Sequence, residues 1–343
     1  MPISSYIAID AMGGDEGLTV MLAGVALARQ RFDSLRFLLV GDEAAIAPAL
    51  KSYPALAQCT EIVHAPDLIT ASEKPSQALR RAKTTSMGMA IDMVKQGRAG
   101  VAVSSGNTGA LMAIAKIALR TLPGIDRPAL AALMPTLGKN DVVMLDLGAN
   151  TECDARNLVQ FAVMGAAYAR TTLDLAAPRV ALLNIGTEAL KGTDSIRDAA
   201  AMLKAATHLP MVFSGFVEGN QLSHGNVDVI VCDGFTGNIA LKTAEGTAKF
   251  VGDLLKRAFR SSIRSKFGFL ISRPATKLLR DHLDPNNHNG GVFLGLNGLV
   301  VKSHGGANAI GVAHAIEVAA KMLRDDLTRR ISDDLSNFEA QAA

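Results

Sequence analysis

A polar turn at residues 104–109 contains the residue types best suited to chemistry in this chain. The turn follows the apolar run 101–103, includes Ser105, Asn107 and two glycines, and precedes a helical pattern. The first turn of a helix has backbone N–H groups without partners and the positive end of the helix dipole, and glycine lets an anion approach that backbone closely. The pattern therefore suits an oxyanion site, although a tight corner without any ligand uses the same residues.

Similar turns follow other apolar runs of the chain. They lie at residues 10–17, 146–150, 184–192, 233–238 and 302–308. Ligands of open α/β sheets bind outside the carboxyl ends of the strands. We therefore expect these turns to converge on one crevice, in which Lys191 supplies positive charge and His304 is the histidine with the most suitable surroundings.

Several other enzyme chemistries find little support. The turn at 10–17 lacks the G-x-G-x-x-G spacing, and its acidic residues Asp10, Asp15 and Glu16 would repel a pyrophosphate, so a nicotinamide site is not expected there. The chain also lacks a G-x-x-x-x-G-K-[ST] loop, a G-x-S-x-G elbow and an H-E-x-x-H pair. The residues alone thus indicate an oxyanion-binding enzyme without fixing its reaction.

The cysteines predict neither a disulfide framework nor a metal site. Cys59, Cys153 and Cys232 are three in number and widely separated, so we expect reduced thiols and no bound metal or other cofactor. An acyl-carrying cysteine remains the less favoured alternative, because none of the three has a histidine in a recognisable local signature.

The elements that position these turns alternate along the chain. Short apolar runs at 6–10, 37–41, 99–104, 142–147, 180–185 and 227–232 predict strands, and the segments 76–96, 155–170 and 194–207 have helical periodicity. Such alternation predicts a mainly parallel, doubly wound sheet with helices on both faces, a three-layer α/β/α fold. No linker or repeat divides the chain, so we expect one α/β domain over residues 1–343.

One basic, amphipathic segment departs from this pattern, and we expect it to form a helical excursion at about 254–285. Residues 254–280 include eight lysines and arginines and no acidic residue, interleaved with apolar side chains. Because the whole chain carries a formal net charge of +3, the remainder without these eight cations is −5. The segment predicts contact with an anionic lipid surface or an acidic protein. A solvated helix pair is the plain alternative, and nucleic acid is not expected.

The composition is that of a folded α/β protein. Of the 343 residues, 49% are hydrophobic, which is ample for a core, and only 4% are aromatic, with no tryptophan. We see no apolar stretch of about 18 residues and no leader-like start, so we expect a cytoplasmic protein.

Taken together, the motifs resemble the bacterial phosphate acyltransferase (PlsX) family nearly from end to end. They lie at residues 9–15, 105–111, 124–129, 145–150, 184–192, 233–238 and 304–305. The resemblance implies transfer of a long-chain fatty acyl group from acyl carrier protein to inorganic phosphate, by direct attack of phosphate on the thioester. The product is acyl phosphate for phospholipid synthesis. The fold would be similar to that of the phosphate acetyltransferase and isocitrate dehydrogenase group.

The resemblance also implies partners and a location. They are acyl carrier protein as donor, inorganic phosphate, a second copy of the chain in a homodimer, and the inner face of the cell membrane as a peripheral binding surface. A downstream membrane glycerol-phosphate acyltransferase is a further candidate partner.

Placed on this sequence, the chemistry assigns candidate residues in three groups. The catalytic candidates are Asn107, Lys191, Asp233, Asn238 and His304. The substrate-binding candidates are Gly13, Gly14, Asp15, Ser105, Gly106, Thr108, Gly109, Asn150, Asn184, Gly186, Gly234, Thr236 and Gly237. The membrane or carrier contacts are Arg260, Arg264, Lys266, Phe267, Phe269 and Leu270.

Within these groups we expect specific roles. The 105–109 backbone with Asn107 and Lys191 would hold phosphate, Asn238 or His304 would polarise the carbonyl, and Asp233 would orient a cationic partner.

Three other functions stay open from the sequence. They are a phosphate acetyltransferase that uses acyl-coenzyme A, a metal-dependent decarboxylating dehydrogenase, and a non-catalytic membrane-binding scaffold. The sequence does not fix the acyl chain length. It also leaves open whether the basic segment binds lipid, which we favour, or the acyl carrier.

Overall fold

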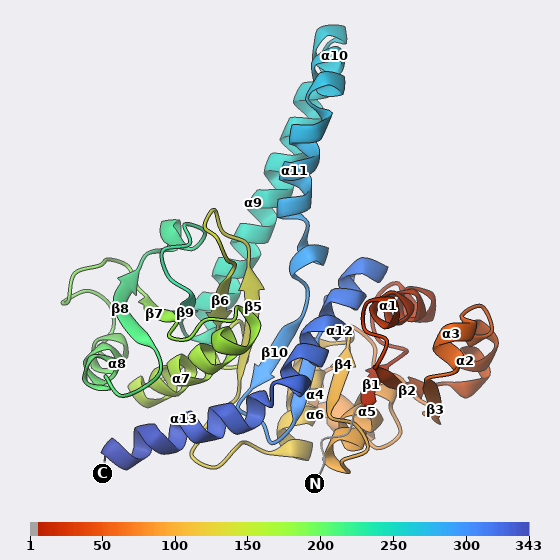
Figure 1. Ribbon diagram of the computed structural model, residues 1–343, viewed down its shortest axis with the longest axis horizontal. Helices are drawn as coiled ribbons and strands as arrows, with labels where there is room; N and C mark the ends of the chain where they lie inside the picture. The colour runs from red at the N-terminus through yellow and green to blue at the C-terminus, as the bar shows by residue number, and fades with distance from the viewer. Residues whose placement is uncertain (1–5, 343) are drawn as a thin grey trace.

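An eleven-stranded sheet runs through the protein in a computed structural model, which describes residues 6–342 (Figure 1). Its strand order is β3-β2-β1-β4-β11-β10-β5-β6-β9-β7-β8. The strands are β1 Tyr6–Asp10, β2 Arg36–Gly41, β3 Thr60–His64, β4 Val101–Ser104, β5 Ala129–Met134, β6 Val142–Leu145, β7 Arg179–Leu183, β8 Val212–Val217, β9 Val229–Val231, β10 Gly291–Leu294 and β11 Leu299–Lys302.

The sheet consists of two parallel halves that run in opposite directions. Strands β3, β2, β1, β4 and β11 are parallel to one another, as are β6, β9, β7 and β8. Between the halves, β10 is antiparallel to both β11 and β5, and β5 is antiparallel to β6. The carboxyl ends of β1, β4 and β11 therefore lie at the opposite edge from those of β6, β9 and β7.

Helices cover both faces of this sheet, which confirms the predicted three-layer arrangement. They are α1 Gly17–Arg31, α2 Glu43–Leu50, α3 Pro54–Ala57, α4 Pro75–Arg81, α5 Ser86–Lys95, α6 Thr108–Leu119, α7 Ala155–Thr172, α8 Asp194–Ala205, α9 Gly234–Arg260, α10 Ile263–Ile271, α11 Arg273–Leu283, α12 Ala309–Arg324 and α13 Leu327–Ala342, with short 3₁₀ turns at Gly219–Gln221 and Pro285–His288.

Successive side chains along each strand point to opposite faces of the sheet and pack into separate apolar clusters. Ile7 and Ile9 of β1 pack in a large cluster with α1, α7, α8, α12 and α13, whereas Ala8 packs on the other face with α4, α5 and α6. In the second half, Met144 of β6 faces a smaller cluster against which Leu241 of α9 packs. Period-2 alternation in fully buried strands produces these two apolar layers.

The predicted helix at 76–96 is wrong in one respect, because the structure has two helices there. Helix α4 ends at Arg81, and Thr85 begins α5 by accepting a hydrogen bond from the Gly88 backbone N–H. A Cβ on Gly88 would lie 1.9 Å from the Ala82 carbonyl oxygen, so the chain folds closely back on itself there. The sequence prediction also missed β3, β5, β8 and β10, although β5 is a six-residue apolar strand.

Helices α9, α10 and α11 form a long hairpin that projects away from the sheet (Figure 1). Only Gly234 and Gly237, at the start of α9, are buried in these three helices. The helical excursion thus starts before the predicted 254, since α9 is continuous from residue 234. Across residues 6–342, no helix combines the length and apolar character that a transmembrane span requires.

Candidate functional site

Three of the predicted turns interlock beyond the ends of β1, β4 and β11. The Asp15 N–H donates to the Gly305 carbonyl at 2.9 Å, and the Ser303 N–H donates to the Ser104 carbonyl at 2.9 Å. A Cβ on Gly13 would lie 2.9 Å from the Gly106 nitrogen, so only glycine permits this approach. We call this group the β1–β4–β11 cluster. It contains the predicted residues Gly13, Gly14, Asp15, Ser105, Gly106, Asn107, Thr108, Gly109 and His304.

Asp10 holds the backbone of the 104–109 turn in place through hydrogen bonds that involve Ser104. The Ser104 hydroxyl donates to Asp10 Oδ2 at 2.6 Å and accepts from the Gly106 N–H at 3.1 Å. Burial raises the pKa of Asp10, and the hydrogen bond from Ser104 opposes that shift. Through Ser104, the buried Asp10 carboxyl therefore stabilises the backbone conformation of this turn.

Asn107 caps helix α6, and its side chain is fully engaged. Its Oδ1 accepts from the Ala110 N–H at 3.0 Å, and its Nδ2 donates to the Ala71 carbonyl at 2.8 Å and the Glu73 carbonyl at 3.0 Å. An amide nitrogen has only two hydrogens to donate. Phosphate binding by this amide would require one of these bonds to break, whereas the backbone N–H groups of the first turn remain unused by the helix itself.

Ser105 and Lys302 complete this cluster. Ser105 is 4% exposed, and its hydroxyl has no hydrogen-bond partner among the described residues. Lys302 Nζ donates to the Ser105 carbonyl at 3.2 Å and also to the Ser303 carbonyl. Burial lowers the pKa of Lys302 to about 8, while Asp10 and Asp15 act to raise it.

Lys302 was not among the site residues predicted from the sequence. Its signal was a lysine that ends an otherwise apolar strand immediately before Ser303 and His304.

The imidazole of His304 is oriented by its neighbours. Its Nδ1 accepts from the Gly306 N–H at 3.2 Å, and its own backbone N–H donates to Asn289 Oδ1 at 2.9 Å. A neutral imidazole that accepts at Nδ1 carries its hydrogen on Nε2. His304 can therefore present an N–H donor, as the proposed carbonyl contact requires.

The remaining predicted turns gather at the opposite edge, beyond β6, β9 and β7. Asp146 accepts hydrogen bonds from the backbone N–H groups of Leu130 at 2.9 Å, Ala149 at 3.0 Å and Asn150 at 2.7 Å. We call this group the β6–β9–β7 cluster. It contains the predicted residues Asn150, Asn184, Gly186, Lys191, Asp233, Gly234, Thr236, Gly237 and Asn238.

Helix α9 begins within this second cluster. Asp233 caps it by accepting from the Thr236 N–H at 2.8 Å and the Thr236 hydroxyl at 2.7 Å. One turn later, Asn238 Nδ2 donates to the Leu147 carbonyl at 3.1 Å, which leaves its second amide hydrogen and its oxygen for a substrate. The structure thus gives Asp233 a capping role, and its role in orienting a cation stays a prediction.

The Lys191 loop is shaped by the buried side chain of Asn184. Asn184 donates to the Lys191 carbonyl at 3.1 Å and accepts from the Ile185 N–H at 2.9 Å. Gly192, with φ +89°, lies so close to Asn184 that a Cβ would meet Oδ1 at 2.3 Å. Lys191 itself is exposed, so its ammonium is free to meet an anion.

The predicted turns therefore follow strands that run in opposite directions in the two halves of the sheet. The antiparallel pairing of β5 with β6 reverses the second half of the sheet, so the turns form two clusters at opposite edges. Helix α9 connects them, because it begins in the β6–β9–β7 cluster and its Lys242 is close enough to lower the pKa of Lys302.

Two cysteines lie at the β6–β9–β7 cluster as protonated thiols. Burial raises the pKa of Cys153 to about 12, and Asp146 and Asp233 reinforce the shift. Cys232 is fully buried, and burial raises its pKa well above the usual range. Neither thiol is poised as a thiolate nucleophile. Within residues 6–342, we find no group of three or more His, Cys, Asp or Glu side chains arranged to bind a metal ion.

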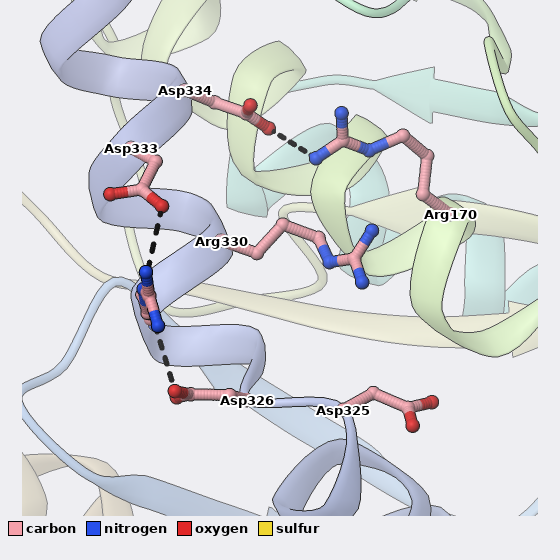
Figure 2. A pocket seen from close by; sticks show the side chains of 7 residues that line it. Arg170, Asp325, Asp326, Arg330, Asp333 and Asp334 are labelled. Carbon is pink, nitrogen blue, oxygen red and sulfur yellow. Dashed lines mark hydrogen bonds and ion pairs between the residues drawn. The ribbon is translucent and has the colours of Figure 1, made fainter.

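A charged hollow between α7 and α13 lies apart from both clusters (Figure 2). In it, Arg170 Nη2 donates to Asp334 Oδ2 at 2.7 Å, and both side chains are nearly buried. The other residues lining the hollow are Asp325, Asp326, Arg329, Arg330 and Asp333. Because cations and carboxylates pair with one another here, we interpret the hollow as part of the structural contact between α13 and α7.

Comparison with known proteins places this geometry in a family. The model for the family described as "Fatty acid synthesis protein" matches residues 5–330. The phosphate acyltransferase of Erythrobacter litoralis is 66% identical over 332 residues, covering 97% of this chain and 94% of that protein. The phosphate acyltransferase of Rhodospirillum centenum is 53% identical over 334 residues, covering 97% and 94%.

Solved structures agree at the level of the fold. A phosphotransacetylase from Streptococcus pyogenes superposes with a TM-score of 0.62 at 18% identity, covering 95% of each chain. The EutD phosphotransacetylase from Staphylococcus aureus gives 0.61 at 17% identity, covering 94% of this chain and 96% of that one. With its full-length relatives and its matching family model, this chain belongs to the phosphate acyltransferase (PlsX) family.

Proposed function

We propose that the protein transfers a long-chain fatty acyl group from acyl carrier protein to inorganic phosphate and so supplies acyl phosphate for phospholipid synthesis. Family membership supports acyl transfer to phosphate. The observation that carries the proposal is the oxyanion-binding character of the 105–109 turn. There, the first backbone N–H groups of α6 lie beside a buried lysine and the buried Ser105 hydroxyl, which has no partner among residues 6–342.

In the proposed reaction, phosphate attacks the thioester directly. An oxygen of HPO₄²⁻ forms a bond to the carbonyl carbon, the carbon–sulfur bond breaks, and the proton of the phosphate passes to the leaving thiolate. The N–H groups of the 105–109 turn hold phosphate, and Lys191 adds positive charge from the other cluster. Asn238 or His304 donates to the developing oxyanion. The protonated state of Cys153 and Cys232 supports a route without an acyl-enzyme.

The decisive experiment follows release of free carrier thiol from acyl-(acyl carrier protein), with acyl phosphate trapped by hydroxylamine. We expect release only when inorganic phosphate is present, and a much slower reaction with acyl-coenzyme A. Equal rates with both thioesters would favour an acetyltransferase-like enzyme. If inorganic phosphate caused no release of the carrier thiol, the result would favour a non-catalytic scaffold.

Variants at the candidate residues test the assignment of roles. Lys191→Ala removes an exposed cation, so we expect the KM for phosphate to rise by about tenfold or more. Asn107→Ala removes the α6 cap and both bonds to the 71–73 segment, so we expect turnover to fall with a loss of about 1 kcal/mol in stability. Near-normal kinetics in both variants would contradict these roles.

The α9–α11 hairpin supports the proposed homodimer and peripheral membrane location. Its helices carry exposed apolar side chains along their length, including Phe250 at 66% and Leu254 at 52% on α9 and Leu278 at 74% on α11. We propose that a second copy covers these side chains and that the tip, α10, rests on the inner face of the membrane. A cytoplasmic location and proximity to the downstream membrane glycerol-phosphate acyltransferase belong to the same proposal.

A further inference from the structure

Two asparagine side chains hold the two ends of the 304–308 turn, which carries His304. At the first end, the backbone N–H of His304 donates to Asn289 Oδ1 at 2.9 Å. At the other end, the backbone N–H of Asn308 donates to Asn286 Oδ1 at 3.0 Å. Both asparagines belong to the short segment between α11 and β10, so a part of the chain outside the turn sets the position of its backbone.

The side chain of Asn289 is buried, and its amide has no hydrogen left to donate. It is 8% exposed, and its Nδ2 donates to the Ser303 hydroxyl at 2.8 Å and to the Gly311 carbonyl at 2.8 Å. An amide nitrogen carries two hydrogens, so these two bonds together with the acceptor at Oδ1 fix the orientation of the group. Asn289 thereby joins the end of β11 and the first turn of α12 to the backbone of His304.

Close packing against α12 keeps both asparagines in place. Asn308 caps this helix by accepting from the backbone N–H groups of Ile310 and Gly311, each at 3.0 Å. A Cβ on Gly311 would lie 2.5 Å from Asn286 Oδ1 and 3.2 Å from Asn289 Nδ2, so a larger residue there would displace these amides. The two asparagines are therefore held by packing as well as by hydrogen bonds.

The imidazole of His304 depends on this backbone for its place. The side chain is exposed, and its Nδ1 bonds to a group of the same turn, the Gly306 N–H, at 3.2 Å. A donor to a developing oxyanion must lie within about 3 Å of that oxygen, and a displacement of about 1 Å costs much of its effect. A shift of the turn would therefore move the imidazole away from the carbonyl that it is proposed to contact.

We propose that Asn289 and Asn286 are positioning residues that place the His304 imidazole at the thioester carbonyl. This inference rests on the proposed function and deepens it, because it takes His304 as the donor to the developing oxyanion and names the residues that hold it there. Neither asparagine touches the substrate. Asn289 acts through the backbone N–H of His304, and Asn286 acts through that of Asn308.

The first test measures the kinetics of full-length Asn289→Ala. Loss of the bond to the His304 N–H lets the turn shift, so we expect kcat to fall by about tenfold to a hundredfold. The KM for phosphate should change by no more than about threefold, because a contact made in the transition state affects turnover. Asn287→Ala is the matched control from the same 3₁₀ turn, since Asn287 Nδ2 donates to the Asp281 carbonyl of α11 at 2.7 Å. It should leave kcat within about twofold of the wild type.

A double-mutant cycle separates positioning from a general loss of structure. Once His304→Gln has removed the imidazole, Asn289→Ala has no catalytic donor left to displace. We therefore expect kcat of the double variant to lie within about threefold of that of His304→Gln alone. A purely structural role of Asn289 would lower kcat by the same factor in both backgrounds.

A second readout requires no activity. In an NMR spectrum of protein with isotopically labelled histidine, the His304 signal is the one of seven that His304→Gln removes. We expect Asn289→Ala to move this signal and Asn287→Ala to leave it in place. Thermal melting shows whether Asn289→Ala folds. If it does not, Asn286→Ala, at a half-buried position, enters the same cycle and spectrum and decides the question.

The outcomes separate this inference from the proposed function. If the wild type releases thiol with phosphate while Asn289→Ala lowers kcat equally in both backgrounds, the inference is wrong and the function stands. A kcat of His304→Gln close to that of the wild type has the same meaning and would leave Asn238 as the carbonyl contact. If the wild type releases no thiol while the His304 signal moves in Asn289→Ala, the positioning of His304 stands and the function is wrong.

Discussion

At the scale of single residues, the structure separates side chains that shape the turns from those that can meet a substrate. Asp10, Asn107 and Asp146 are occupied by hydrogen bonds to backbone or to neighbouring side chains. Lys191, Asn238 and His304 keep donors for a ligand. Polar type and spacing alone do not separate these two roles, because a capping asparagine and a ligand-binding asparagine have the same place in a strand-end turn.

The state of the thiols gives a prediction at this scale. Because burial holds the pKa of Cys153 at about 12 and that of Cys232 well above its usual range, both stay protonated at neutral pH. We expect the double variant Cys153→Ala, Cys232→Ala to keep kcat within about threefold of the wild type. Mass spectrometry of wild-type protein incubated with acyl donor and no phosphate should show no acylated cysteine. A stable acyl-enzyme at either cysteine would overturn direct attack.

At the scale of elements, the helices serve distinct tasks. Helix α6 presents its first turn to the 105–109 backbone, α9 links the two clusters, and α13 closes the core against α7. Sequence periodicity identified the helix at 155–170 well, because the capping box of Asp154 with Asn157 and a buried face coincide there. It joined α4 to α5 wrongly, because their separation depends on a tertiary contact, the backbone hydrogen bonds of Asp67 with Thr84 and Ser86.

The contact of α13 with α7 can be tested through its ion pair. Arg170→Met removes the cation and leaves the Asp334 carboxylate buried without its partner, so we expect a loss of about 3 kcal/mol in the free energy of unfolding. Arg329→Met is the control, because its pair with Asp333 is exposed and 3.7 Å apart, and it should change stability by less than about 0.5 kcal/mol. Denaturant unfolding measures both. Equal effects would mean that the buried pair is not what holds α13.

The tip of the hairpin can be tested for membrane contact. Phe267, Leu270 and Ile271 of α10 are exposed by 65%, 62% and 82%, whereas the Phe269 ring lies 5.2 Å from that of Phe259 and supports the hairpin itself. We expect Phe267→Ser, Leu270→Ser and Ile271→Ser together to abolish flotation with anionic liposomes, since apolar side chains and basic charge act jointly at such surfaces.

The same triple variant separates lipid contact from carrier docking. An unchanged KM for the acyl carrier would assign the tip to lipid. Unchanged flotation with a raised KM for the carrier would assign it to docking, with Arg260, Arg264 and Lys266 as the charges that attract an acidic partner.

At the scale of the whole molecule, the two opposed halves of the sheet and the projecting hairpin decide how the protein works. The hairpin exposes apolar side chains over much of its length and buries only two glycines at its base, so an isolated chain would leave a large apolar surface in water (Figure 1).

Dimerisation through the hairpin can be tested by measuring the molecular mass of the protein in solution. Leu254→Glu with Leu278→Glu places two charges on that surface, and we expect light scattering to report a monomer where the wild type is a dimer. Lys256→Glu is the control on another face of α9, about 200° around the helix from Leu254, and should leave the dimer intact. A monomeric wild type would contradict the proposed dimer directly.

The sequence by itself determined the layers, most of the strands and the residues of the strand-end turns, because apolar periodicity and glycine placement are local properties of the chain. It also carried enough long motifs in order to indicate the family. Only the tertiary structure decided which turns meet, because the antiparallel pairing of β5 with β6 reverses half of the sheet. The same packing also sets the electrostatic surroundings of Lys302, because Lys242 of α9 acts to lower its pKa. Residues 60 positions apart in sequence become electrostatic neighbours only through such packing.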